Sequence, residues 1–147
     1  MTMPSVLLLV QLATTLPLVG LIWFVQVVAY PQFARVGRGN FAAYHAAHSR
    51  HITFVVAPLM LGELAASLAW LHWSPPGESS AVVMGGAALS LLAWLVTGLI
   101  SVPAHHRLSG GFDPGAHRRL VATNWLRTVA WTARAALLLW IVASSLH

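Results

Sequence analysis

The sequence predicts an all-α fold, a bundle of four transmembrane helices, and three observations support this prediction. Hydrophobic residues make up 58% of the 147 residues and charged residues only 7%, against about 25% in an ordinary soluble domain. Four apolar stretches reach the length of about 20 residues that a helix needs to cross a bilayer. Short polar segments separate these stretches. We therefore expect one four-helix membrane domain over residues 1–147.

The first apolar stretch extends from Val6 to about Tyr30 and includes two polar residues, Gln11 and Gln26. Because proline lacks the backbone N–H that continues a helix, Pro31 is expected to end this one. No basic residue precedes the stretch, and no small-residue cleavage site closes it at signal-peptide length. We therefore expect a retained helix rather than a signal peptide.

The other three stretches have a similar length and are also bounded by polar residues. They run from about Arg50 to Trp70, from Ala81 to Val102, and from about Leu120 to Leu146. Pro103 is expected to end the third helix. Turn-forming residues predict connections at 74–78 and 109–115, and the connection at 31–49 is long enough for a short interfacial helix.

The placement of arginine predicts the orientation of the bundle. Six of the eight basic residues lie in or beside the first and third connections, namely Arg35, Arg38, Arg50, Arg107, Arg118 and Arg119. The second connection and both tails carry no Lys or Arg. The positive-inside rule then places both termini on the non-cytoplasmic side. We expect a multi-pass protein of a bacterial inner membrane, with Trp70, Trp73 and Trp125 as anchors at the two interfaces.

Six of the eight histidines fall at the predicted cytoplasmic face, namely His45, His48, His51, His105, His106 and His117. Neutral imidazole is the commonest metal ligand and also carries protons near neutral pH. Residues three apart on a helix lie about 60° apart, so neighbouring histidines of the first group can share a ligand. The candidate metal ligands are His45, His48, His51, His105 and His106, with His48 and His51 as candidate cofactor ligands. Alternatively, these imidazoles are solvated interfacial groups that contact lipid headgroups.

Three ionisable residues fall inside the apolar stretches. Glu63 lies about 18 Å into the second stretch, and Arg127 and Arg134 lie about 12 and 22 Å into the fourth. A charge near mid-bilayer costs about 2.5–3.5 kcal/mol on insertion scales. We therefore expect Glu63 to pair with Arg134, Arg127 or both inside the bundle.

The fourth stretch carries a polar stripe. Asn124, Arg127, Trp131 and Arg134 are spaced i, i+3, i+7 and i+10, which places them on one helix face. Because lipid cannot satisfy this face, it should point into the bundle and line a polar cleft open to the cytoplasm. Together with Glu63 these four are the candidate catalytic residues. The alternative is structural: a buried Arg–Glu pair that only fixes helix register.

Several function classes are set aside by what the sequence lacks. Three carboxylates are too few for a carboxylate-rich di-iron site. There is no glycine-rich phosphate loop and no Ser-His-acid arrangement. Rows of basic and aromatic residues for nucleic acid are also missing, so no nucleic-acid partner is expected.

Two segments resemble the anthrone oxygenase-like family of small four-helix membrane proteins. They are Val102-Pro103-Ala104-His105-His106-Arg107-Leu108 and Asn124-Trp125-Leu126-Arg127-Thr128-Val129-Ala130-Trp131-Thr132. The resemblance covers mainly the C-terminal half. It implies Asn124, Arg127 and Trp131 as site residues and oxygenation of a polycyclic phenolic substrate. His105 or His106 stands near the place of a usual Asn, which favours a metal or haem. In size and span count the chain is also similar to the four-helix bacterial protoporphyrinogen oxidases, which implies haem on a histidine.

Three functions are consistent with these patterns. The first is a membrane oxidoreductase or oxygenase that acts on a lipophilic, aromatic or quinone-like substrate, with copper, iron or haem as cofactor. The second is a non-catalytic accessory subunit of a larger respiratory or photosynthetic membrane complex that binds pigment or lipid. The third is a small transporter or proton channel, although broken paired helices are missing. The expected partners are membrane lipids, a lipophilic small molecule, and either further copies or a larger complex.

Overall fold

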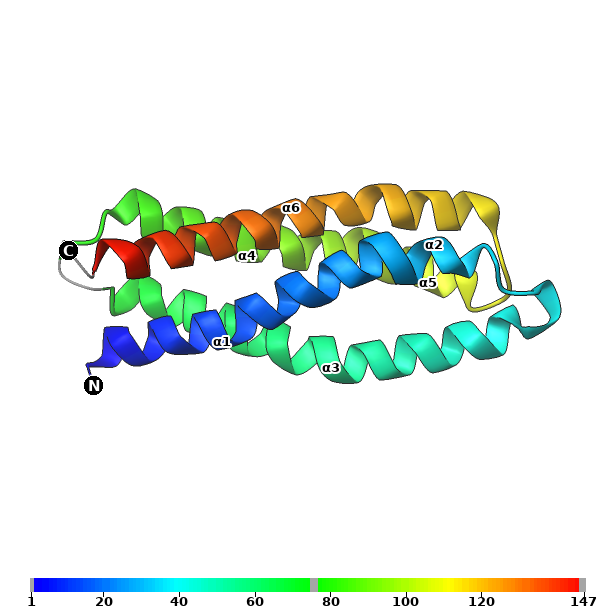
Figure 1. The fold of residues 1–147 in the computed structure, drawn as a ribbon, viewed down its shortest axis with the longest axis horizontal. Coiled ribbons are helices and arrows are strands. Elements are labelled where there is room, and N and C mark those ends of the chain that lie inside the picture. Colours follow the sequence, from blue (N-terminus) through cyan, green and yellow to red (C-terminus); the bar gives the residue numbers. More distant parts are fainter. Residues whose placement is uncertain (1, 75–76, 146–147) are drawn as a thin grey trace.

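The computed structural model describes residues 2–74 and 77–145, and this part of the chain forms an antiparallel bundle of four long helices (Figure 1). Each is long and apolar enough to cross a membrane: Met3–Phe33, Arg38–His72, Ser80–Leu108 and Pro114–Ser144. The four-helix prediction is therefore confirmed. Pro75, Pro76 and the predicted last residue of the fourth helix, Leu146, lie outside the described residues.

Each helix packs against two neighbours, so the four form a ring. The first helix contacts the second and fourth, and the third helix contacts the same two. The start of the first helix, the end of the fourth and the helix ends at His72 and Ser80 lie at one end of the bundle, and the connections at 34–37 and 109–113 lie at the opposite end (Figure 1). The basic connections therefore lie at the end opposite the termini, and the six histidines named above lie in the half of the bundle next to these connections.

The first and third helices are not ended by proline, contrary to the sequence-based expectation. The first consists of α1 (Met3–Phe24), the π-helix η1 (Val25–Ala29) and α2 (Tyr30–Phe33), and Pro31 lies inside it. A proline ring clashes with the carbonyl of residue i−4 and removes one hydrogen bond. A π turn contains one residue more than an α turn. The π turn that precedes the proline makes room for its ring, so the helix continues.

The third helix repeats this arrangement. It consists of α4 (Ser80–Val96), the π-helix η2 (Thr97–Ser101) and α5 (Val102–Leu108), with Pro103 as the second residue of α5. In both helices a five-residue π segment ends two residues before the proline. Such π-bulges occur frequently at functional sites.

The second long helix, α3 (Arg38–His72), begins earlier than predicted. No separate interfacial helix forms, because residues 38–49 are the first turns of α3 and the connection is short. His45, His48 and His51 consequently lie on one continuous helix.

The fourth long helix, α6 (Pro114–Ser144), begins after an Asp113 cap. Asp113 Oδ1 accepts hydrogen bonds from the backbone N–H groups of Gly115 at 2.7 Å and Ala116 at 2.9 Å. These two N–H groups hold the pKa of the Asp113 carboxyl below its ordinary value, and the N–H group of Ala116 has the larger effect.

Three clusters of buried apolar residues lie one after another along the described part of the bundle. The first surrounds Phe33 and Phe41 near the histidines, the second surrounds Met60 and Trp131 at mid-length, and the third surrounds Trp70 near the termini. Trp70 is 4% exposed and packs inside the bundle, so the prediction that it anchors an interface is wrong. It belongs to a buried cluster with Leu138 and Ile141 of α6.

Candidate functional site

The polar stripe of α6 faces the bundle interior, as the sequence predicted. Asn124, Arg127, Trp131 and Arg134 are exposed by 0%, 6%, 1% and 0% respectively. The two arginines, seven positions apart, have different surroundings. Arg134 belongs to a closed network that we call the inner network, and Arg127 lines a cavity.

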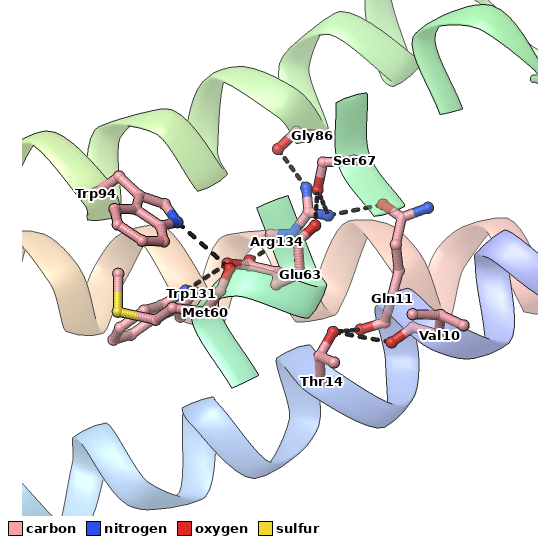
Figure 2. A network of polar contacts seen from close by, with 10 residues as sticks. All are labelled: Val10, Gln11, Thr14, Met60, Glu63, Ser67, Gly86, Trp94, Trp131 and Arg134. Carbon is pink, nitrogen blue, oxygen red and sulfur yellow. Dashed lines mark hydrogen bonds and ion pairs between the residues drawn. The ribbon is translucent and has the colours of Figure 1, made fainter. Parts of the chain in front are cut away.

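The inner network joins all four long helices around the Arg134 guanidinium (Figure 2). Arg134 Nε lies 2.7 Å from Glu63 Oε1, so the predicted pairing of Glu63 with Arg134 is confirmed. Arg134 Nη2 donates to Gln11 Oε1 at 2.6 Å and also to the Ser67 hydroxyl, while Nη1 donates to the Gly86 carbonyl. This guanidinium thus has one carboxylate partner and three hydrogen-bond acceptors, which come from α1, α3 and α4.

Trp131 and Gly86 also contribute to the inner network. Trp131 Nε1 donates to the second carboxylate oxygen of Glu63 at 3.3 Å. A Cβ on Gly86 would lie 3.2 Å from Arg134 Nη1, so the close approach of α4 to Arg134 requires a small residue there. Neither Glu63 nor Arg134 lines the cavity described next.

A cavity of about 440 Å³ lies between α1, α3, α6 and the η2–α5 segment. Its inner wall is apolar and includes Leu18, Ile22, Met60, Trp94 and Trp131. Its outer wall is polar and is formed by Tyr30, His45, His105, His106 and Arg127. The two π-helices contribute directly to the wall through Val25, Thr97 and Ser101.

The exposed lining residues come from only two segments. Ala46 and Thr53 belong to α3, and Val102, His106 and Ser109 belong to α5 or follow it directly. α3 and α5 contact one another sparsely. The mouth of the cavity therefore lies between these two segments, on the side of the bundle.

A hydrogen-bonded chain of three side chains forms part of the polar wall. The Tyr30 hydroxyl lies 3.0 Å from His105 Nε2, and His105 Nδ1 lies 2.9 Å from His45 Nε2. We call this chain the Tyr–His–His relay. Its members come from α2, α5 and α3. The relay connects groups up to 75 residues apart in sequence.

Among the described residues, Arg127 is the only arginine that lines the cavity, and no acidic residue lines it. Its Nη1 donates to Asn124 Oδ1 at 3.3 Å, and its Cζ lies 5.0 Å from the centre of the Trp131 ring. Asn124 is in turn held by Gln26, whose Oε1 accepts from Asn124 Nδ2 at 2.8 Å. The Nε of Arg127 is buried without a partner, and no described carboxylate lies within ion-pair distance of Arg127.

The structure divides the predicted site residues into two groups. Those that line the cavity are His45, His105, His106, Arg127 and Trp131. Asn124 lies behind Arg127, Glu63 and Arg134 form the inner network, His48 packs against Phe33 with ring centroids 4.9 Å apart, and His51 is exposed. His117 bonds the Tyr30 carbonyl at 2.7 Å and so supports the Tyr30 segment.

The predicted metal ligands do not form a ligand set in this structure. Among the described residues, no three histidine or carboxylate side chains are grouped so that they could hold one metal ion. Both ring nitrogens of His105 are engaged, one with His45 and one with Tyr30. The prediction of copper, iron or haem at His45, His48, His51, His105 and His106 therefore rests on the sequence.

Sequence reasoning missed Tyr30, Met60 and Trp94 as site residues. Tyr30 carried a usable signal, because a tyrosine directly before a proline in an apolar stretch is a polar group that needs a partner. Met60 and Trp94 carried none, since apolar residues in a membrane helix are equally suited to lipid.

In comparisons with models of protein families, with curated proteins and with solved structures, nothing matches this chain. The resemblance to the anthrone oxygenase-like family thus stays a prediction. Fold and site define a helical bundle with four candidate membrane spans, a closed ionic network at its centre and a side cavity with a polar wall.

Proposed function

We propose that this protein is an integral membrane oxidoreductase or oxygenase-like enzyme that acts on a lipophilic, aromatic or quinone-like molecule in the side cavity. The observation that carries the proposal is the Tyr–His–His relay, which borders an apolar cavity next to Arg127. In the proposed orientation both termini are non-cytoplasmic, so the cavity lies in the cytoplasmic half of a bacterial inner membrane.

The size and composition of the cavity favour an organic ligand. Small-molecule sites measure about 300–1,000 Å³ and combine apolar walls with a few placed polar groups. The volume of about 440 Å³ falls in that range. Trp94 and Trp131 offer flat faces on the inner wall, and aromatic rings pack well against such faces.

The polar wall supplies proton chemistry. Oxidation of a hydroquinone to a quinone removes two electrons and two protons, and these reduce either dioxygen to hydrogen peroxide or an acceptor quinone to its hydroquinone. The relay offers a path for a proton from the ligand hydroxyl through Tyr30 and His105 to His45. Arg127 stabilises the oxyanion that forms when that proton leaves, because a fixed donor is strong in a site that excludes water.

No step of this proposal passes through a metal or haem. The cofactor predicted from the sequence is tested directly by elemental analysis and a visible spectrum of the purified protein. A stoichiometric metal or a haem spectrum that changes in His105→Ala would add a redox centre to the proposal.

Substitution of each of the two tyrosines of the chain by phenylalanine tests the role of the relay. Tyr30→Phe removes the hydroxyl that bonds His105, while Tyr44→Phe alters an exposed ring and is the matched control. Oxidation of a decyl-substituted hydroquinone is followed by absorbance with protein in lipid nanodiscs under air. The loss of a proton-transfer group should slow Tyr30→Phe at least about tenfold, with no change in Tyr44→Phe. Equal rates in the two variants, or no oxidation by the natural protein, would overturn the proposal.

The same experiment separates the alternative function. A ligand that binds in the cavity without being oxidised would favour a non-catalytic accessory subunit that holds pigment or lipid. Purification in mild detergent then shows whether further copies or a larger membrane complex accompany the chain.

A further inference from the structure

We infer that the side cavity selects ligands with one negatively charged oxygen group, a carboxylate, phenolate or enolate, which binds against Arg127. The inference deepens the proposed function, since it concerns the same cavity, but it requires binding only and no turnover. The expected ligand is an amphiphile with an aromatic body and a single acidic head.

The charge balance of the bundle is the first argument. Arg134 has a carboxylate partner at 2.7 Å, whereas Arg127 is 6% exposed and has no described carboxylate within ion-pair distance. Taking a charge out of water is costly unless an opposite charge compensates it. Of the other two acidic residues, Asp113 caps α6 and Glu78 lies in the connection at the far end of the bundle. A bound anion would supply the missing opposite charge.

The hydrogen-bond geometry of Arg127 is the second argument. A guanidinium has five N–H donors in a rigid fork. The structure gives Arg127 an acceptor in Asn124, leaves its Nε buried without a partner, and places Tyr30 beside it as a further polar neighbour. Arg127 lines the cavity, so N–H groups that do not bond Asn124 remain for a ligand oxygen there, and carboxylate oxygens bind a guanidinium in the plane of its fork.

The histidines do not replace this charge. With the Tyr30 hydroxyl donating to His105 Nε2, His105 Nδ1–H donates to His45 Nε2, so both hydrogen bonds of the relay form with both imidazoles neutral. The reverse direction of donation along the relay also leaves both imidazoles neutral. Arg127 is then the fixed charge of the wall, and the anionic head is expected beside it.

The shape of the cavity orients the rest of the molecule. The head lies among Arg127, Tyr30 and His105, and the apolar wall of Met60 and Trp94 continues inward from there. The mouth between α3 and α5 lies on the side of the bundle, so the ligand is taken from the surrounding lipid. An amphiphile dissolved in a leaflet already has its polar head at this level and its apolar body inward.

Equilibrium binding of naphthoate and of its neutral isostere naphthamide tests the inference, since the two probes differ in charge but hardly in shape. Binding is followed by tryptophan fluorescence in nanodiscs of neutral lipid. The natural protein should bind naphthoate at least about tenfold more tightly than naphthamide. In Arg127→Gln the two affinities should agree within about twofold.

Two further variants keep the test decisive. Arg107→Gln removes an exposed charge next to the mouth, and it should leave the preference for naphthoate unchanged. Asn124→Asp is nearly isosteric and places a carboxylate next to Arg127, so it should abolish the preference even if Arg127→Gln fails to fold. Equal affinities in the natural protein, or a preference that survives Asn124→Asp and Arg127→Gln, would overturn the inference. These outcomes are independent of hydroquinone oxidation, which tests the proposed function.

Discussion

Arg127 and Arg134 lie seven residues apart on one helix and point into the same bundle, yet their surroundings are opposite. Arg134 is enclosed by a carboxylate, a side-chain amide, a hydroxyl and a backbone carbonyl from the other three long helices. Arg127 has one asparagine, an aromatic face and an apolar cavity. The sequence alone gives the two residues the same appearance: a charge in an apolar helix.

This difference teaches how to separate structure from function among buried charges. A charge that the fold satisfies completely has nothing left to offer a ligand, and it holds the helices in register. A charge that the fold buries but leaves without an opposite charge is costly, and binding is the simplest reason to retain it. The inner network therefore stabilises the fold, and Arg127 serves the cavity.

The largest expected effect comes from Glu63→Gln. The variant leaves the Arg134 charge buried without compensation, which should lower the free energy of unfolding by about 3–5 kcal/mol. Unfolding by SDS in mixed micelles, followed by circular dichroism, measures this loss. Glu78→Gln, the same substitution in the connection near the termini, is the control and should have almost no effect.

A smaller effect is expected at Gly86, where space rather than charge is altered. In Gly86→Ala the new methyl group would lie 3.2 Å from Arg134 Nη1, whereas nothing lies within 4 Å of a Cβ on Gly85. Overpacking of this kind costs about 1–3 kcal/mol. Gly85→Ala should instead be neutral or stabilise the helix by up to about 1 kcal/mol. Equal unfolding free energies for the two variants would show that α4 does not depend on its close approach to Arg134.

Part of the fold and part of the site could be predicted from the sequence. The four helices and the Glu63–Arg134 pair were predictable because hydrocarbon tolerates neither polar backbone nor lone charges. The continuation of the helices past Pro31 and Pro103 was not predictable, because the π-helices that accommodate each proline leave no separate signal in the sequence. The Tyr–His–His relay was also out of reach as a set. Its members meet only through the packing of helices distant in sequence.

The smallest effect is expected outside both arginine sites, at the Asp113 cap. Backbone N–H groups lower the pKa of the Asp113 carboxyl in the folded protein. The contribution of this carboxylate to the free energy of unfolding is therefore complete above its ordinary pKa of about 4. That contribution is lost as the pH falls through the lowered value. Asp113→Ala should therefore lower the melting temperature slightly at neutral pH, and the difference from the natural protein should shrink on acidification. A difference that grows on acidification would contradict the cap.

The contrast between the two arginines is tested most directly by measuring the free energies of unfolding of Arg127→Met and Arg134→Met side by side. Arg134→Met leaves the Glu63 carboxylate buried alone, and it should lose about 3–5 kcal/mol. Arg127→Met removes an uncompensated charge and fills its place with an apolar chain, so its stability should be unchanged or higher. Equal losses in the two variants, or a larger loss in Arg127→Met, would contradict the division into a structural and a ligand-binding arginine.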